Sequence, residues 1–93
     1  MVRAAQPRHT LRYLSSNFHT DFVRIPREGR AAGRSLRQLD IRHETGATII
    51  AVQRGRETIP SPDPDFVVGQ GDTVVALGTR EELAALDRLL GRA

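Results

Sequence analysis

The sequence predicts an α+β domain in which a small mixed or antiparallel β-sheet carries two helices on one face. Two short runs rich in β-branched residues, 47–53 and 73–77, lie next to glycines and are typical of buried strands. Two segments with leucines at helical spacing, 36–45 and 79–90, begin beside a Ser or Thr that can cap a helix. A chain of 93 residues has room for one such domain.

The first segment, residues 1–20, is polar and basic. Leu11, Leu14 and Phe18 are among its few apolar residues, and their spacing fits one stripe of a helix about two turns long. No cap or continued pattern supports a stable helix there. We therefore expect residues 1–20 to be a basic tail, flexible or docked on a partner, followed by one folded domain over residues 21–93.

The front half of the domain is predicted to run from a strand into a helix. Residues 22–25 have strand character and are followed by a proline that ends the strand. Residues 26–34 contain two glycines and form a turn-rich connection. Ser35 is a good N-cap for a short helix over 36–45, straight or bent, which Gly46 ends in the left-handed conformation.

The middle of the chain is predicted to be a β-hairpin. Residues 47–53 form the clearest strand, Arg54-Gly55 makes a tight turn, and 56–59 return as a short antiparallel partner. The prolines that follow exclude a central strand and stiffen a loop: Pro60, Pro62 and Pro64.

The last part is predicted to be a strand followed by a helix. Residues 73–77 form another buried strand after a glycine-containing turn. Thr79 and Glu82 have the spacing of a capping box, which opens a helix that continues to about Leu90. Gly91 is its stop signal.

Composition limits the cellular setting and the partners. The chain has no cysteine and no apolar run near the ~20 residues that a membrane span needs, so we expect a cytoplasmic protein. Residues 1–42 hold nine Arg and three acidic residues, whereas residues 43–93 hold five Arg and eight acidic residues. The basic front favours an anionic partner, with a solvated tail as the alternative.

The sequence lacks the constellations that catalysis or metal binding requires. The three His residues are scattered, and the neighbours His43 and Glu44 would point about 100° apart on a helix. No serine has an evident base beside it, and no glycine-rich phosphate loop opens a helix. We expect neither an enzyme nor a metal site, and no resident cofactor.

Four motifs, in this order and spacing, carry a resemblance to a known family. They are Gly33-Arg-Ser-Leu-Arg-Gln-Leu39, Asp40-Ile-Arg42 leading into 45–52, Arg54-Gly55 with Ile59-Pro60-Ser61-Pro62, and 71–78 with the closing leucine helix. The chain from residue 22 to residue 90 thus resembles the C-terminal domain of regulators of potassium conductance (RCK_C), also called the TrkA-C domain.

The resemblance implies a homodimeric regulatory module over residues 21–93. Such modules bias an integral-membrane cation channel, symporter or cation/proton antiporter in bacteria, so the expected place is cytoplasmic and peripheral to the membrane. No nucleotide-binding Rossmann domain precedes the module in this sequence. This implies either a stand-alone regulatory subunit or the C-terminal part of a longer one, without Rossmann-type NAD or ATP binding.

The resemblance also implies a binding site for cyclic di-AMP in a groove between two protomers. It assigns these residues to the site: Leu36, Asp40, Arg42, Thr48, Ile49, Pro60 and Pro62, the last two as alternatives for one proline. Thr48 stands where Asn is usual, and Arg37 replaces an aliphatic residue. An intrachain ion pair between Asp40 and Arg42 is the alternative to ligand contact.

Two other functions remain open from the sequence. One is a structural dimerisation domain without a ligand, because two leucine-faced helices offer more apolar surface than one small sheet covers. The other is a basic nucleic-acid-binding module. We disfavour nucleic acid because the chain has only four aromatic residues and no helix-turn-helix or zinc spacing.

Overall fold

A computed structural model describes residues 17–92, and the parts of the expected tail before residue 17 lie outside this range. The elements are β1 (His19–Arg24), α2 (Leu36–Leu39), α3 (Ile41–Thr45), β2 (Thr48–Arg54), β3 (Glu57–Pro60), β4 (Thr73–Gly78), α4 (Arg80–Asp87) and a final turn η1 (Arg88–Arg92). The four strands form one sheet in the order β1-β4-β2-β3, and every neighbouring pair is antiparallel. The predicted α+β class is confirmed, with an antiparallel sheet.

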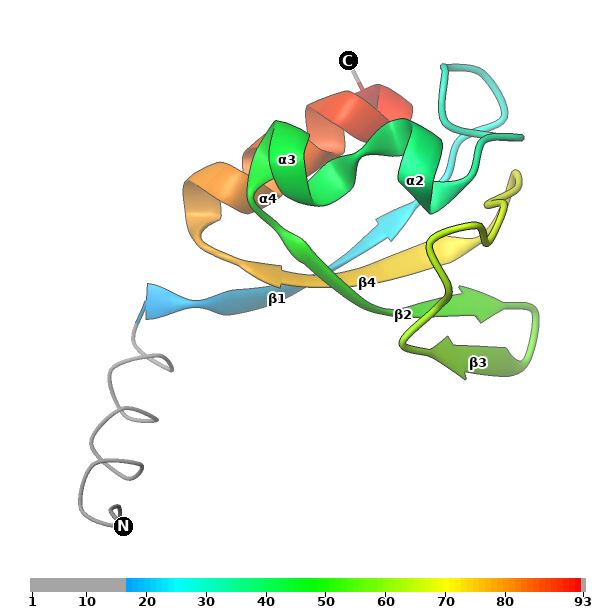
Figure 1. Ribbon diagram of the computed structural model, residues 1–93, viewed down its shortest axis with the longest axis horizontal. Coiled ribbons are helices and arrows are strands. Elements are labelled where there is room, and N and C mark those ends of the chain that lie inside the picture. Colours follow the sequence, from blue (N-terminus) through cyan, green and yellow to red (C-terminus); the bar gives the residue numbers. More distant parts are fainter. Residues whose placement is uncertain (1–16, 93) are drawn as a thin grey trace, which may run out of the picture.

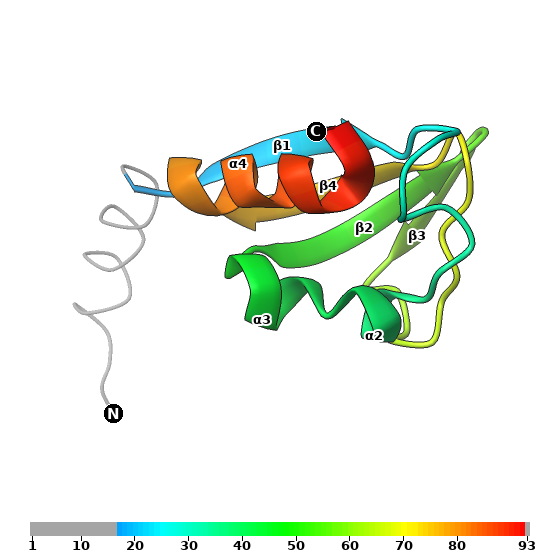
Figure 2. The ribbon, with the colours of Figure 1, turned by 90° about the horizontal axis from the view of Figure 1, so that it is seen from above.

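The helices form a single layer on one face of the sheet (Figure 1). Seen from above, α4 covers β1 and β4, whereas α2 and α3 run along the side where β2 lies (Figure 2). Val23, Val74 and Val52 are aligned across three strands and buried under this layer. Helix residues complete the core from above: Leu36, Leu39, Ile41, Leu83, Leu86 and Leu90.

The strands differ from the sequence prediction at three places. The first strand begins at His19, inside the expected tail, because it pairs with β4 along its whole length. The hairpin turn is Gly55-Arg56, one residue later than predicted, with Gly55 at φ 61°. Pro60 is the last residue of β3 and not part of the loop. A proline is tolerated there because β3 is an edge strand.

The predicted capping signals are confirmed. Ser35 Oγ accepts the N–H of Gln38, and the Ser35 N–H donates to Gln38 Oε1, which closes a capping box at the start of α2. Thr79 and Glu82 form the same arrangement at α4. Gly46 ends α3 at φ 85°. No helix among residues 17–92 is long and apolar enough to cross a membrane.

An ion pair that the sequence did not predict fastens the turn before β4. Asp72 is 3% exposed, and its two carboxylate oxygens accept Arg54 Nε and Nη2 at 2.9 and 2.7 Å. Arg54 also donates to the carbonyl of Val67 and lies 4.8 Å from the centre of the Phe66 ring. Val67 also forms an isolated β-bridge with Ser35. The interactions of Arg54 therefore hold in place the residues that contact the start of α2.

Candidate functional site

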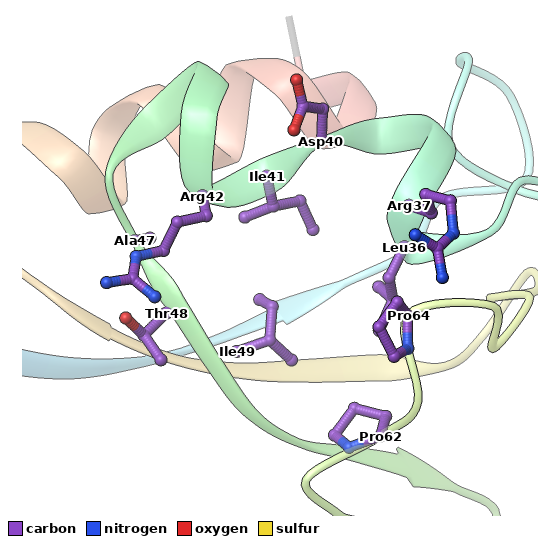
Figure 3. A pocket seen from close by; sticks show the side chains of 10 residues that line it. All are labelled: Leu36, Arg37, Asp40, Ile41, Arg42, Ala47, Thr48, Ile49, Pro62 and Pro64. Carbon is purple, nitrogen blue, oxygen red and sulfur yellow. The ribbon is translucent and has the colours of Figure 1, made fainter.

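A pocket of about 290 Å³ lies between the α2–α3 segment, the start of β2 and the chain that follows β3. Figure 3 shows the side chains that line it. They are Leu36, Arg37, Asp40, Ile41, Arg42, Ala47, Thr48, Ile49, Pro62 and Pro64. Three stretches that are separate in the sequence therefore meet at one place.

Six of the seven residues that the sequence assigned to a ligand site line this pocket. They are Leu36, Asp40, Arg42, Thr48, Ile49 and Pro62. Pro60 does not line it, because it lies in β3 opposite Ala51. Of the two alternatives for one proline, the pocket therefore contains Pro62.

Four lining residues were not assigned from the sequence: Arg37, Ile41, Ala47 and Pro64. Ile41 and Ala47 are buried and have no polar side-chain group that would have marked them as site residues. Pro64 was recognised only as a loop-stiffening residue. Arg37 was noted as a departure from the family pattern, and that departure was the signal that could have identified it.

The joint between α2 and α3 places Arg42. Asp40 has φ 51° and ψ 45°, the left-handed conformation, and it is at once the C-cap of α2 and the N-cap of α3. The chain changes direction there, so that α3 begins above the start of β2. Figure 3 shows the Arg42 side chain extending down from α3 towards Thr48. Arg42 and Thr48 are both exposed, which leaves their polar groups accessible to a ligand.

A β-bulge in β2 places Ile49. The register of β2 against β4 shifts between Ile49 and Ala51. Ile49 lies opposite Ala76, which is fully buried, and its half-buried side chain packs against the core while lining the pocket. The bulge thereby gives the pocket an apolar wall beside the hydroxyl of Thr48.

The prolines form the opposite wall, and backbone hydrogen bonds fix them. The N–H of Arg37 donates to the carbonyl of Pro64 at 2.7 Å, and the N–H of Leu36 donates to that of Phe66 at 2.9 Å. The first N–H groups of a helix have no partner within the helix, so this wall satisfies them. On the other side, Ser61 N–H donates to Ile50 O at 2.9 Å.

The charged groups of the pocket differ in whether they have a partner. Arg42 forms no ion pair or hydrogen bond with any side chain among residues 17–92, and the alternative pairing of Asp40 with Arg42 is wrong. Asp40 instead contacts His43, with Oδ2 3.2 Å from Nδ1. Arg37 pairs with Asp65 at 2.8 Å, and this hydrogen bond lowers the pKa of Asp65 and raises that of Arg37.

Asp40 lies beside His43 and Glu44, the two neighbours that were rejected as a metal site because their side chains would point apart on a helix. Ligand atoms of Asp40, His43 and Glu44 lie within 4.8 Å of one another, because Asp40 is three and four residues before the other two. All three residues are exposed. The contacts of His43 with the two carboxylates account for the grouping, and we assign no ion to it.

Comparison with known proteins identifies the family of the chain. A family model described as the TrkA-C domain matches residues 22–91. The chain belongs to the TrkA-C family. The resemblance inferred from the sequence motifs is confirmed.

Relatives of this TrkA-C domain include much longer proteins. Potassium channel protein 1 of Methanocaldococcus jannaschii is 51% identical over 53 residues, which cover 57% of this chain and 16% of that protein. The chain thus spans only a small part of this relative.

Two solved structures share the fold of this TrkA-C domain. The RCK_C domain dimer of BusR from S. agalactiae, in complex with c-di-AMP, superposes with a TM-score of 0.72 and 28% identity, covering 76% of this chain and 93% of that one. The RCK C domain of the potassium transport protein KtrA, in complex with cyclic diadenosine monophosphate, gives 0.74 and 28%, covering 91% and 98%.

Proposed function

We propose that this TrkA-C domain is a ligand-sensing regulatory module of a potassium or other cation transport system, and that its ligand is cyclic di-AMP. The observation that carries the proposal is the pocket beneath α2 and α3, where Arg42, which pairs with no side chain in the described part of the chain, lies beside a hydroxyl and apolar walls. Two relatives of the same fold were solved with this ligand. The role is regulatory and not catalytic.

The chemistry of the pocket fits half of a cyclic dinucleotide. A guanidinium offers a planar set of donors for a phosphate and a surface for stacking on a base, so Arg42 can serve either part. Leu36, Ile49 and Pro62 provide the apolar contact that a base requires. Thr48 keeps a hydroxyl donor and acceptor at the position where the family pattern has an amide.

The size of the pocket favours a dimer. About 290 Å³ is at the lower limit of pockets that enclose a small molecule, which run from roughly 300 to 1,000 Å³. Two protomers related by a two-fold axis would supply two such pockets and two copies of Arg42, matching a ligand with two nucleotides. A ligand bound across the axis favours one dimer geometry, and a membrane partner would respond to the change in population.

Calorimetric titration with cyclic di-AMP tests the proposal. We expect one ligand bound per two chains, and Arg42→Ala to weaken binding by about 10-fold or more, because each charge-assisted hydrogen bond to phosphate contributes about 1.5–3 kcal/mol. Arg24→Ala is the matched control, because Arg24 is exposed on β1 and outside the pocket. Absence of binding by the wild-type chain would contradict the proposal.

A further inference from the structure

The pocket has a second arginine, Arg37, whose partner lies outside the lining. Arg37 Nε donates to Asp65 Oδ1 at 2.8 Å, while the lining includes Arg37 and not Asp65. A guanidinium has five N–H donors. In Arg37, Nε–H is the one donor that a side chain among residues 17–92 engages. Because no other described side chain engages the remaining donors, they can bind an anion in the pocket.

The position of Arg37 is fixed more firmly than its side chain. Its backbone N–H bonds to Pro64 O at 2.7 Å, which sets Arg37 beside the proline wall. Figure 3 shows its side chain next to Pro64, at the opposite end of the pocket from Arg42. The side chains of the pair are 65% and 73% exposed for Arg37 and Asp65. Exposed ion pairs are weak, so a phosphate can displace the carboxylate.

The charges give a reason for this exchange. The lining contains Arg37, Arg42 and Asp40, and Asp65 neutralises Arg37 from outside. If Arg37 stays with Asp65, Arg42 is the only lining cation that has no side-chain partner among residues 17–92. If Arg37 turns to the ligand, each nucleotide meets two guanidinium groups, one at each end of the pocket. With two arginines in the pocket, one guanidinium can bind the phosphate while the other stacks on the base.

We propose that Arg37 is a second arginine that contacts the ligand and that Asp65 competes with the ligand for it. Asp65 then acts as a built-in competitor that lowers the affinity of the site. The backbone N–H of Asp65 donates to Asp63 Oδ1 at 2.8 Å, which fixes the backbone that carries the competing carboxylate. Ligand binding thereby releases Asp65, in the same segment as the proline wall. The inference rests on the proposed function and concerns the same pocket.

Titration of four proteins with cyclic di-AMP tests the competition: the wild type, Asp65→Asn, Arg37→Met and the double variant. Asp65→Asn is expected to tighten binding by about 3-fold, because a weak exposed pair no longer holds Arg37. Arg37→Met keeps the apolar stem and is expected to weaken binding by about 10-fold. In the double variant Asp65→Asn should have no further effect, since its target is gone.

Asp63→Asn is the matched control, because Asn keeps the acceptor for the Asp65 N–H while removing a nearby charge that Arg37 does not bond. We expect unchanged affinity. If Asp63→Asn and Asp65→Asn tighten binding equally, the loss of negative charge in general, and not the Arg37–Asp65 pair, explains the effect, and the inference is overturned. An unchanged affinity of Arg37→Met for the ligand would also overturn it.

The same data separate the two proposals. If the wild type binds and Arg42→Ala loses binding, while Arg37→Met and Asp65→Asn change nothing, the proposed function stands and this inference falls. If the wild type does not bind cyclic di-AMP, the proposed function itself falls. All substituted side chains are exposed, so thermal unfolding of each variant is expected to match the wild type.

Discussion

At the scale of single residues, Asp72 shows how this small fold keeps a charge inside. Its carboxylate is buried, yet Arg54 reaches both oxygens and the N–H of Gly69 donates to Oδ2 at 2.8 Å. A buried charge is tolerated only when it is paired and hydrogen-bonded, and here both conditions are met. The hydrogen bonds from Arg54 lower the pKa of Asp72, with a smaller contribution from Gly69.

Asp72→Asn is expected to lower the free energy of unfolding by about 2 kcal/mol at pH 7, because it replaces charge-assisted hydrogen bonds. The folded pKa lies below the unfolded value of about 3.9, so the stabilisation is complete above that pH and is lost as the pH falls through the folded pKa. The difference between variant and wild type should therefore shrink in acid. Urea unfolding at pH 7 and pH 3 measures both effects.

Asp63→Asn provides the comparison for this prediction, since Asp63 is exposed and its amide would keep the bond to the N–H of Asp65. It should leave stability at pH 7 nearly unchanged. An equal loss in both variants would mean that charge removal in general, and not the buried pair, is responsible.

The Arg54–Asp72 pair also shows which residue-scale features the sequence hides. The two residues are 18 positions apart, and their meeting depends on β2 and β4 being neighbours in the sheet. Local patterns predict caps, because the partners at Ser35 and Thr79 are three residues away. They cannot predict a pair that exists only after the strands have been ordered.

At the scale of secondary-structure elements, the α2–α3 joint matters most for the site. The sequence predicted one helix over residues 36–45, which could be bent, and the structure divides it at Asp40. Aspartate tolerates the left-handed conformation better than most residues, but it does not require it. The motif identified the pocket residues Leu36, Asp40, Arg42, Thr48 and Ile49, whereas the turn that orients Arg42 became visible only in the structure. The bulge at Ile49 was hidden for the same reason.

The joint yields a prediction that separates two roles of Asp40. Replacing Asp40 by Gly keeps the left-handed geometry and should leave stability within about 0.5 kcal/mol of the wild type, whereas Asp40→Ala should cost about 1 kcal/mol. Thermal unfolding compares the two. If the carboxylate does not touch the ligand, Asp40→Gly should also retain affinity for cyclic di-AMP.

Two other outcomes for the Asp40 variants would contradict this prediction. Normal stability with lost affinity in Asp40→Gly would show that the Asp40 carboxylate takes part in binding. Equal stability of the Gly and Ala variants would show that the left-handed conformation is not a constraint on this joint.

At the scale of the whole molecule, the pocket lies where the helix layer stands over the side of the sheet. α2 and α3 lie above β2, and the chain after β3 rises to meet the start of α2 (Figures 1 and 2). The exposed side chains of Arg37 and Arg42 belong to this side. A second copy that approaches here would place its own pocket opposite the first.

Under the proposed function, dimerisation and ligand binding would be thermodynamically linked. A ligand that binds the dimer and not the monomer should tighten the dimer by the factor 1 + [L]/Kd, which is about 100-fold at a ligand concentration 100 times its Kd. Sedimentation equilibrium at increasing cyclic di-AMP should therefore show a falling dissociation constant of the dimer. If the chain is already fully dimeric, ligand binding appears instead as a rise in the melting temperature, which reports binding and not its linkage to dimerisation. In Arg42→Ala, whose Kd is expected to rise about 10-fold or more, the same ligand concentration should tighten the dimer by only about 10-fold or less. A wild-type chain that binds the ligand as a monomer, with no change in association, would show that each pocket works alone and that no site spans two protomers.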